Sequence, residues 1–281
     1  MGIPMYIVDA FTDQPFSGNP AAVCLVDPKE VLANETMQHI AAEMNLSETV
    51  FVTPEKGSFK DATLFEIRWF TPTTEVDLCG HATLAAAAVL FFKKGNNSGA
   101  ITFNSRSGKL IVERSENGMI CLDFPANPPE KRACVKDLSL VHSVHLGKCG
   151  NLLVRLVDSF KRKDFEALAP NIDDMVRSKA KVIGVGLTMR GTAENGCIDN
   201  SGTVFDFVSR YFTPWRGIAE DPVTGSWHTV SACYWAEQLH KKSVYARQCS
   251  LRGGNLWVDV NGDRVTISGR AVINMEGIFT V

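Results

Sequence analysis

The sequence predicts an α+β protein built from two similar lobes, each made of mixed strands with antiparallel hairpins and two helices. Three observations lead there. The 281-residue chain repeats short segments at a spacing of about half its length, each half holds one strongly apolar helical stretch, and short turns join several predicted strands. A doubly wound parallel sheet would instead require strands and helices to alternate throughout.

An internal repeat is the strongest of these observations. Arg68-Trp-Phe-Thr-Pro72 returns as Arg210-Tyr-Phe-Thr-Pro214, an offset of 210 − 68 = 142. The period is far longer than the ~20–50 residues of solenoids and propellers, which indicates a duplicated lobe. A two-lobed protein is expected to bind its ligand in the cleft between the lobes. The paired segments are 68–72 with 210–214, 80–83 with 225–229, 106–110 with 252–256, and 117–118 with 261–262.

Two helices are predicted in the first half. Asn34 is expected to cap the first helix, whose apolar residues recur at the 3.6-residue helical period. The second helix covers 83–94, and Gly95 stands where a glycine commonly ends a helix. The apolar face of the first helix is formed by Met37, Ile40, Ala41 and Met44.

Strands in the first half follow from alternation and from residues that break secondary structure. Phe65, Ile67 and Trp69 alternate with polar or charged residues, and Pro54 ends another strand. Asn117-Gly118 favours a hairpin with a type I′ turn. The predicted strands are 6–11, 21–26, 49–53, 63–70, 109–115 and 119–124.

A boundary is predicted at 126–130, where two prolines interrupt any strand. The lobes then cover 1–128 and 129–270. The second half repeats the scheme of the first. It is predicted to contain helices near 171–179 and at 227–239, strands at 180–187 and 204–212, a hairpin at 255–267 turning at Asn261-Gly262, and late strands at 272–274 and 277–281.

Composition excludes several classes of function. A formal net charge of −2 provides no basic field for nucleic acid or for an anionic membrane. The eight cysteines form no Cys-x-x-Cys pair, and the N-terminus lacks a signal peptide, so we expect a cytoplasmic protein with reduced thiols. No dinucleotide fingerprint or P-loop is present, and Asp77, Cys79 and His81 lack the second half of a zinc site. Neither a cofactor nor a metal is therefore expected.

The first candidate for catalysis is Glu48, in the segment Asn45-Leu-Ser-Glu-Thr49 between a helix and a strand. Apolar neighbours disfavour the charged carboxylate, so its pKa should rise toward the range useful for moving protons. The alternative is a surface glutamate that caps a turn, and spacing alone favours that alternative.

The second candidate is the start of the apolar helix after Leu78. Gly80 would let a ligand approach backbone N–H groups there, and the helix N-terminus attracts anions. His81 could bind a substrate carboxylate or relay a proton, or it could be packed locally with no such role. Cys79 could act as a thiolate base, but a small buried residue is the favoured interpretation.

The third candidate is Glu220-Asp-Pro-Val-Thr-Gly-Ser226, the counterpart in the second lobe. Gly225 again precedes a helix, and Ser226 could cap that helix or bind an anion. The acids, Asp221 included, could equally be turn residues only. A fourth segment, 16–22, forms a tight turn from which the Asn19 amide could reach a ligand.

Four segments together resemble the phenazine biosynthesis F-like family and span both lobes: 16–22, 45–49, 78–83 and 220–226. The resemblance implies a diaminopimelate epimerase-like fold. In it, two pseudo-symmetric lobes each wrap a curled, mostly antiparallel sheet around a central apolar helix. The segment 271–281 would return to the first lobe.

The resemblance also implies proton-transfer chemistry without a cofactor. By similarity, Glu48 is the catalytic acid/base, and His81 and Asp221 assist it. The residues implied in substrate binding are Asn19, Ser47, Gly80, Gly225 and Ser226.

We therefore expect a cofactor-independent isomerase that moves a proton on a small carboxylate-bearing metabolite. One alternative is a racemase or epimerase using Glu48 and Cys79, although the loop 221–226 has no second cysteine. Another is a non-catalytic ligand-binding or protein-interaction module on the same fold. No nucleic acid or membrane partner is expected, and a homodimer and other protein partners are left open.

Overall fold

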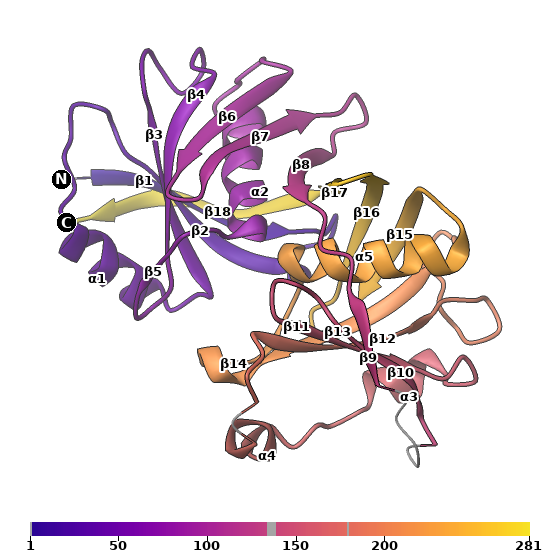
Figure 1. Cartoon of the computed structure of the whole chain (residues 1–281). Helices are drawn as coiled ribbons and strands as arrows, with labels where there is room; N and C mark the ends of the chain where they lie inside the picture. Colours follow the sequence, from indigo (N-terminus) through magenta and orange to yellow (C-terminus); the bar gives the residue numbers. More distant parts are fainter. Residues whose placement is uncertain (1, 134–138, 179) are drawn as a thin grey trace. The chain divides into compact units, whose positions relative to one another are not determined.

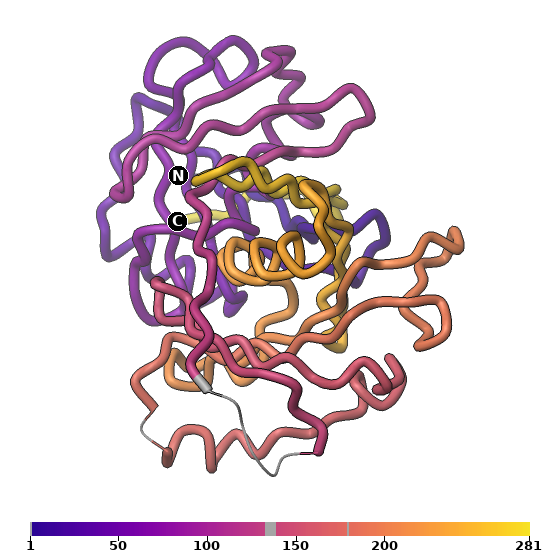
Figure 2. The backbone as a smooth tube through the Cα atoms, turned by 45° about the vertical axis from the view of Figure 1, so that its right-hand side comes forward, coloured from indigo at the N-terminus to yellow at the C-terminus, as the bar shows by residue number. Residues whose placement is uncertain are grey.

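The computed structural model describes residues 2–133, 139–178 and 180–281. The chain divides into two compact units. The first comprises Met1–Asp123 with Ser268–Val281, and the second comprises Phe124–Ile267. Figure 2 follows the chain through both, and its two ends lie side by side in the first unit.

The first unit is a mixed sheet. Its pairings run β1–β2 antiparallel, β2–β3 parallel, β3–β4 antiparallel, β4–β6 parallel, and β6–β7–β8 antiparallel. The C-terminal strand β18 (Ala271–Thr280) pairs with the free side of β1, and short β5 (Glu75–Val76) pairs with β4 (Figure 1). The other strands are β1 (Gly2–Ala10), β2 (Asn19–Leu25), β3 (Glu48–Pro54), β4 (Leu64–Phe70), β6 (Ala100–Ser105), β7 (Gly108–Arg114) and β8 (Ile120–Pro125).

A buried helix, α2 (Gly80–Ala88), fills the concave side of this sheet. It packs against β1, β2, β3 and β18, and every residue from His81 to Ala88 is buried. A helix buried all round must be apolar all round, and its run of alanines lets the strands approach closely. The helix begins three residues before the predicted start. Its last turn is a π-helix, Val89–Lys93, and Gly95 follows with φ +66°, which confirms the predicted glycine stop.

The other helix of the first unit, α1 (Asn34–Met44), confirms the predicted apolar face. Met37, Ile40 and Ala41 are buried, and Met44 packs against the same cluster. The predicted cap is wrong. Ala33 occupies the N-cap position without any side-chain cap, and the Asn34 amide oxygen instead accepts a hydrogen bond from Arg68.

The predicted type I′ turn at Asn117-Gly118 is also wrong. That turn needs positive φ at both central residues, but only Gly118 has it, at +78°. The Ser115 N–H donates to the Met119 carbonyl across a three-residue loop, and the Gly118 N–H donates back to the Ser115 carbonyl. Glycine in the left-handed region suits this longer loop.

The second unit repeats the strand order of the first. Its pairings run β10–β11 antiparallel, β11–β12 parallel, β12–β13 antiparallel, β13–β15 parallel and β15–β16 antiparallel, with short β14 beside β13. The strands are β9 (Glu130–Ala133), β10 (Val141–Leu146), β11 (Asn151–Leu156), β12 (Gly184–Arg190), β13 (Phe207–Thr213), β14 (Ile218–Asp221), β15 (Ser243–Gln248), β16 (Gly254–Asn261) and β17 (Arg264–Gly269). The matched order confirms the duplication inferred from the sequence.

Helices also occupy matching places in the two units. The short helices α3 (Arg162–Glu166) and α4 (Ile172–Arg177) lie between β11 and β12, where α1 lies between β2 and β3. The long helix α5 (Gly225–Leu239) follows β14 and packs against β11, β15 and β16, as α2 follows β5. Gly225 and Gly80 therefore begin equivalent helices.

Several elements of the second half differ from the prediction. The β10–β11 pair had not been predicted, and the strand predicted at 180–187 begins at Gly184. Glycines interrupt its apolar pattern because aromatic rings press on them: a Cβ at Gly186 would lie 2.2 Å from the Trp227 ring. The helix predicted near 171–179 is α4, and residue 179 lies outside the described residues. The two late strands form one strand, β18.

The repeated Arg-x-Phe motif makes the same contacts in both units. Arg68 on β4 grips Glu75 through two hydrogen bonds of 2.8 Å, and its guanidinium lies 5.1 Å from the Phe70 ring centroid. Arg210 on β13 grips Glu220 at 2.7 and 2.8 Å, and it lies 5.1 Å from the Phe212 ring. Each of these two-bond contacts, an arginine fork, joins a long strand (β4 or β13) to the short strand beside it (β5 or β14).

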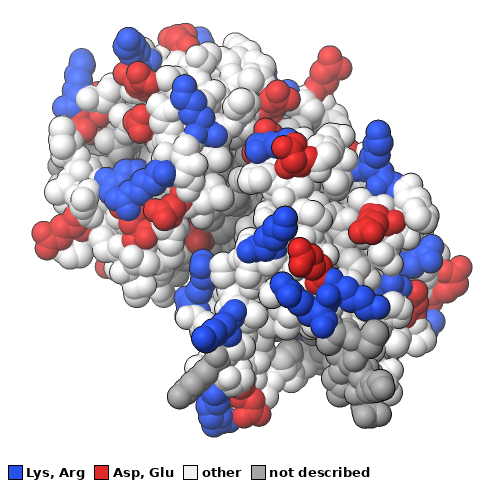
Figure 3. All heavy atoms as spheres, viewed as in Figure 1, with Lys and Arg blue, Asp and Glu red and all other residues white. Residues whose placement is uncertain are grey.

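On the face shown in Figure 3, basic and acidic side chains are interspersed over the first unit. Within the described part of the chain, no helix is both long and apolar enough to cross a membrane.

The two arginine forks predict unequal stability losses. Arg210 has 9% of its side chain exposed and also donates to the carbonyls of Phe165, Glu166 and Leu168, whereas Arg68 is 29% exposed. We expect Arg210→Gln to lower the free energy of unfolding by about 3–5 kcal/mol, because it removes a buried guanidinium that holds Glu220 and three backbone carbonyls, whereas Glu75 keeps Arg106 when Arg68 is replaced. The matched change Arg68→Gln should cost about 1 kcal/mol or less. Urea unfolding of both variants checks this, and equal losses would contradict it.

Candidate active site

Glu48 is the first residue of β3 and lies inside the first unit. The parallel pairing with β2 sets Glu48 opposite Ala21, and α1 ends three residues earlier at Asn45, whose left-handed backbone (φ 49°) turns the chain. Only 13% of the Glu48 side chain is exposed. That burial contradicts the alternative of a surface glutamate capping a turn.

Burial raises the pKa of the Glu48 carboxyl, because desolvation disfavours its charged form. Hydrogen bonding from the Ser47 and Cys79 side chains lowers the same pKa but does not overcome burial. Oε2 is buried and has no hydrogen-bond donor of good geometry among the described residues. A carboxyl with a raised pKa can accept a proton from a ligand and return it.

His81 lies beside Glu48, in the first turn of α2. Its Nε2 is 3.2 Å from Glu48 Oε2 and 3.3 Å from Ser47 Oγ. Its Nδ1 is 3.2 Å from Asn19 Nδ2 and 3.4 Å from Cys79 Sγ. The imidazole therefore lies between the Glu48 carboxyl, which contacts Nε2, and the Asn19 amide and Cys79 thiol, which contact Nδ1.

The hydrogen-bond partners assign the tautomer of His81. The Ser47 hydroxyl donates to Asn19 Oδ1 at 3.3 Å, which leaves the Asn19 NH₂ group facing the ring. An amide nitrogen can only donate, so Nδ1 accepts and the proton of the neutral ring resides on Nε2. The Nε2–H group then points to the side of the ring where Glu48 lies.

The N-terminus of α2 carries no side-chain cap. Cys79 is the N-cap residue in an extended conformation, and its side chain makes no cap hydrogen bond. The Thr83 hydroxyl donates instead to the Cys79 carbonyl at 2.6 Å. The positive end of the α2 helix dipole therefore lies beside His81 and is not capped by a side chain.

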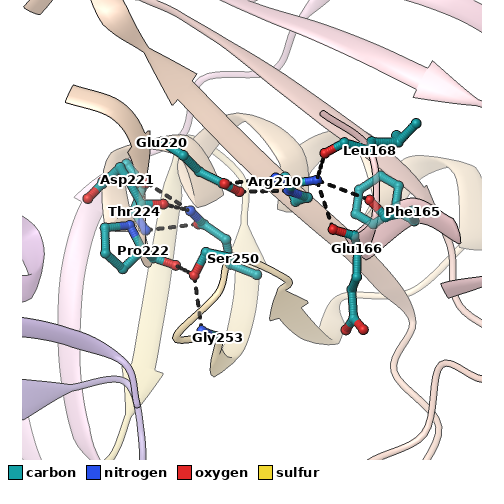
Figure 4. A network of polar contacts seen from close by, with 11 residues as sticks. Phe165, Glu166, Leu168, Arg210, Glu220, Asp221, Pro222, Thr224, Ser250 and Gly253 are labelled. Carbon is teal, nitrogen blue, oxygen red and sulfur yellow. Dashed lines mark hydrogen bonds and ion pairs between the residues drawn. The ribbon is translucent and has the colours of Figure 1, made fainter. Parts of the chain in front are cut away.

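The second unit holds Asp221 at the end of β14, where a compact network fixes it (Figure 4). The Thr224 hydroxyl donates to Asp221 Oδ2 at 2.5 Å. Gln248, fully buried at the end of β15, donates to the Asp221 carbonyl at 2.7 Å and accepts from the Thr224 N–H at 2.9 Å. Side chains of Thr224, Gln248 and Ser250 therefore all hold the loop before α5 through hydrogen bonds.

Gln248 was missed by the sequence reasoning. In β15 the inward positions are Val244, Ala246 and Gln248, so a polar residue occupies the apolar phase of the strand. That break in the alternation is the signal that could have revealed it, because a buried amide needs partners.

The start of α5 is arranged like the start of α2. Thr224 is the N-cap residue but gives its hydroxyl to Asp221 rather than to the helix, so α5 has no side-chain cap. Gly225 is buried and Ser226 is exposed in the first turn. His228 Nδ1 donates to the Thr224 carbonyl at 2.8 Å, and complete burial lowers the pKa of His228 to about 4.

The structure thus gathers the candidate residues into two sets. Asn19, Ser47, Glu48 and His81, with Cys79, form one cluster in the first unit. Asp221 is joined to the N-cap of the helix that begins with Gly225 and Ser226 in the second unit. The prediction that both sets serve one ligand stays a prediction.

Known proteins match this chain along nearly its whole length. The family model described as "Phenazine biosynthesis-like protein" matches residues 8–277. A phenazine biosynthesis-like domain-containing protein of Bos taurus is 46% identical and aligns over 100% of both chains. An uncharacterized isomerase of Pseudomonas aeruginosa is 44% identical over 99% of this chain and 98% of that one. The crystal structure of a PhzF-family protein from Enterococcus faecalis matches with a TM-score of 0.86 and 36% identity, covering 100% of both chains.

His228 predicts a measurable loss of stability in acid. Its pKa falls from an ordinary 6.5 to about 4 in the folded protein, so between these values the unfolded chain binds a proton that the folded one does not. Stability should therefore be intact above pH 6.5 and decline as the pH falls toward 4, by about 3 kcal/mol from this residue. His228→Asn keeps a donor but cannot titrate, so its stability deficit relative to wild type should shrink by that amount at pH 4.

Urea unfolding at pH 7 and pH 4 measures this difference. The control is His240→Asn, the same substitution at an exposed residue whose left-handed backbone asparagine tolerates. A constant deficit for His228→Asn at both pH values would show that the buried imidazole is not the group responsible.

Proposed function

Because the chain belongs to the phenazine biosynthesis-like protein family, we propose that it is an isomerase that moves a proton on a small carboxylate-bearing metabolite without a cofactor. Relatives named isomerases, 44% and 43% identical over nearly the whole chain, support this class of enzyme. The single observation that carries the proposal is the buried Glu48 carboxyl, which lies 3.2 Å from His81 and whose pKa is raised by burial.

Glu48 is the proposed acid/base. As a carboxylate it takes a proton from an acidified carbon of the ligand, and the electron pair of that C–H bond passes into the ligand as an enolate-like system. As a carboxylic acid it returns the proton at another carbon, so the ligand is isomerised and Glu48 is regenerated. Its raised pKa reduces the free-energy difference between the carboxylate and the carboxylic acid, the two forms that this cycle uses.

Neighbouring groups in the first unit have distinct proposed roles. The Nε2–H of His81 stabilises negative charge on Glu48 or on the ligand, while Asn19 and Ser47 hold the ring in its orientation. The uncapped first turn of α2 binds the ligand's carboxylate or developing oxyanion through backbone N–H groups near Gly80. Preorganised donors of this type avoid the cost of reorienting water during the reaction.

Residues of the second unit are proposed to assist. Asp221 is buried and fixed by Thr224 and Gln248, and the uncapped start of α5 offers Gly225 and Ser226. Asp221→Asn keeps the shape and should lower turnover by about 10-fold or more if the carboxylate acts in the reaction. Unchanged turnover would assign Asp221 a purely structural part.

Two other functions remain distinguishable by experiment. In a racemase or epimerase, Cys79 would be a second acid/base opposite Glu48. Its sulfur lies 3.4 Å from Nδ1 of the imidazole whose Nε2 contacts Glu48, so the thiol and the carboxyl belong to one cluster of the first unit. A binding module would hold the ligand without exchanging its protons.

Replacement of Glu48 tests the proposal directly. Glu48→Gln keeps the size of the side chain but removes the group that exchanges protons. We expect it to leave ligand binding nearly intact and to lower the exchange rate by about 10²–10⁴. The measurement is proton NMR of a panel of small carboxylic acids incubated with the protein in D₂O, which reports deuterium entering a C–H position.

Cys79→Ser is the matched substitution within the same cluster. It should reduce exchange by less than about 10-fold, because the thiol is not the proton acceptor. If Cys79→Ser abolishes exchange and Glu48→Gln spares it, the epimerase mechanism replaces the one proposed. If wild-type protein binds a ligand yet never exchanges its protons, the molecule is a binding module.

A further inference from the structure

Three groups of different chemistry meet in the first unit: the Glu48 carboxylate, the Cys79 thiol and the His81 imidazole. One potential ligand atom from each lies within 4.8 Å of the other two. Carboxylate oxygen, thiolate sulfur and imidazole nitrogen are the three ligand types that proteins use for zinc. We propose that this cluster binds one Zn²⁺, which blocks the proposed proton transfer because it occupies Glu48.

The spacing of the cluster suits a tetrahedral ion. With Zn–S near 2.3 Å and Zn–N or Zn–O near 2.0–2.1 Å, ligand atoms on one zinc are separated by about 3.3–3.6 Å. Cys79 Sγ and Glu48 Oε2 contact different nitrogens of His81, at 3.4 and 3.2 Å, so the imidazole has to turn for one nitrogen to face both groups. One potential ligand atom from each residue already lies within 4.8 Å of the other two, and binding of the ion would draw them closer. Three protein ligands leave the fourth position for water or for an anionic ligand.

A second layer of contacts supports the imidazole. Metal-binding histidines almost always have their other ring nitrogen held by a hydrogen bond, which fixes the ring and strengthens the ligand. Asn19 lies 3.2 Å from Nδ1 and Ser47 lies 3.3 Å from Nε2, so a partner is in place for whichever nitrogen remains.

The ligand set also selects the ion. Calcium and magnesium require mainly oxygen ligands, and this cluster supplies one carboxylate beside a sulfur and a nitrogen. Zinc and cobalt accept all three. Glu48, which the proposed function needs as a proton acceptor, would be tied to the ion, so zinc should act as an inhibitor competing with the organic ligand.

Cobalt provides the test, because four-coordinate Co²⁺ bound by a thiolate has a sulfur-to-metal charge-transfer absorption. Purified full-length protein, stripped with a chelator, is titrated with Co²⁺ and then with Zn²⁺. We expect one ion per chain, a thiolate absorption band, and its loss on addition of zinc. Cys79→Ala should abolish the band and weaken zinc binding by about 100-fold or more. Asn19→Ala should weaken it by about 10–100-fold.

The matched control is Cys149→Ala, the same substitution at a half-buried cysteine of the second unit. It should bind both ions like wild type. Glu48→Gln provides a variant of unchanged size that should also lose affinity. Absence of binding, a cobalt complex without thiolate absorption, or equal zinc affinity in Cys79→Ala and wild type would overturn the proposal.

Failure of the zinc site and failure of the proposed function give different results. Ion binding is read without any organic ligand, and proton exchange is read in the presence of a chelator. If wild-type protein exchanges protons but binds no cobalt, only the proposed zinc site is disproved. If zinc binds through Glu48 and Cys79 but the Glu48→Gln variant keeps full proton exchange, only the proposed role of Glu48 as acid/base is disproved.

Discussion

The contact of 3.2 Å between Glu48 and His81 is the interaction on which the account of this protein depends. It exists because the parallel pairing of β2 and β3 brings Asn19 and Glu48 to the same end of neighbouring strands, while α2 begins at Gly80 beside them. Burial raises the pKa of the carboxyl, and contacts with Asn19 and Ser47 hold the imidazole beside it. Neither group would have this chemistry on an exposed loop.

The duplicated framework explains why the site can be so well ordered. In each unit an arginine fork joins the strand before the long helix to the short strand beside it, and the helix then begins with a glycine and no side-chain cap. Glu220 of the second fork directly precedes Asp221 in β14. Both long helices begin without a side-chain cap, and the N-terminus of a helix attracts anions.

Sequence predicted much of this, and the failures have physical causes. The repeat predicted the two units with the same strand order, and apolar runs predicted α2 and α5. Strand β12 was shifted because glycine is required under the Trp227 ring, which removed the apolar pattern that marks a strand. Gln248 was missed because its importance comes from three hydrogen bonds made across 24 and 27 positions of chain. Residue patterns indicated most candidate residues and the family resemblance assigned their roles, whereas the burial of Glu48 and the partners of His81 depend on contacts between segments far apart in the sequence.

The decisive experiment for Glu48 as the acid/base is a crystal structure with a bound ligand. Crystals would be soaked with a library of small carboxylic acids, and the ligand identified from its density. We expect the ligand's carboxylate at the start of α2 and a C–H carbon about 3–3.5 Å from the Glu48 carboxyl, which is the distance of a reactive contact. A ligand bound with Glu48 out of reach of every C–H carbon would contradict the assignment of Glu48 as the acid/base.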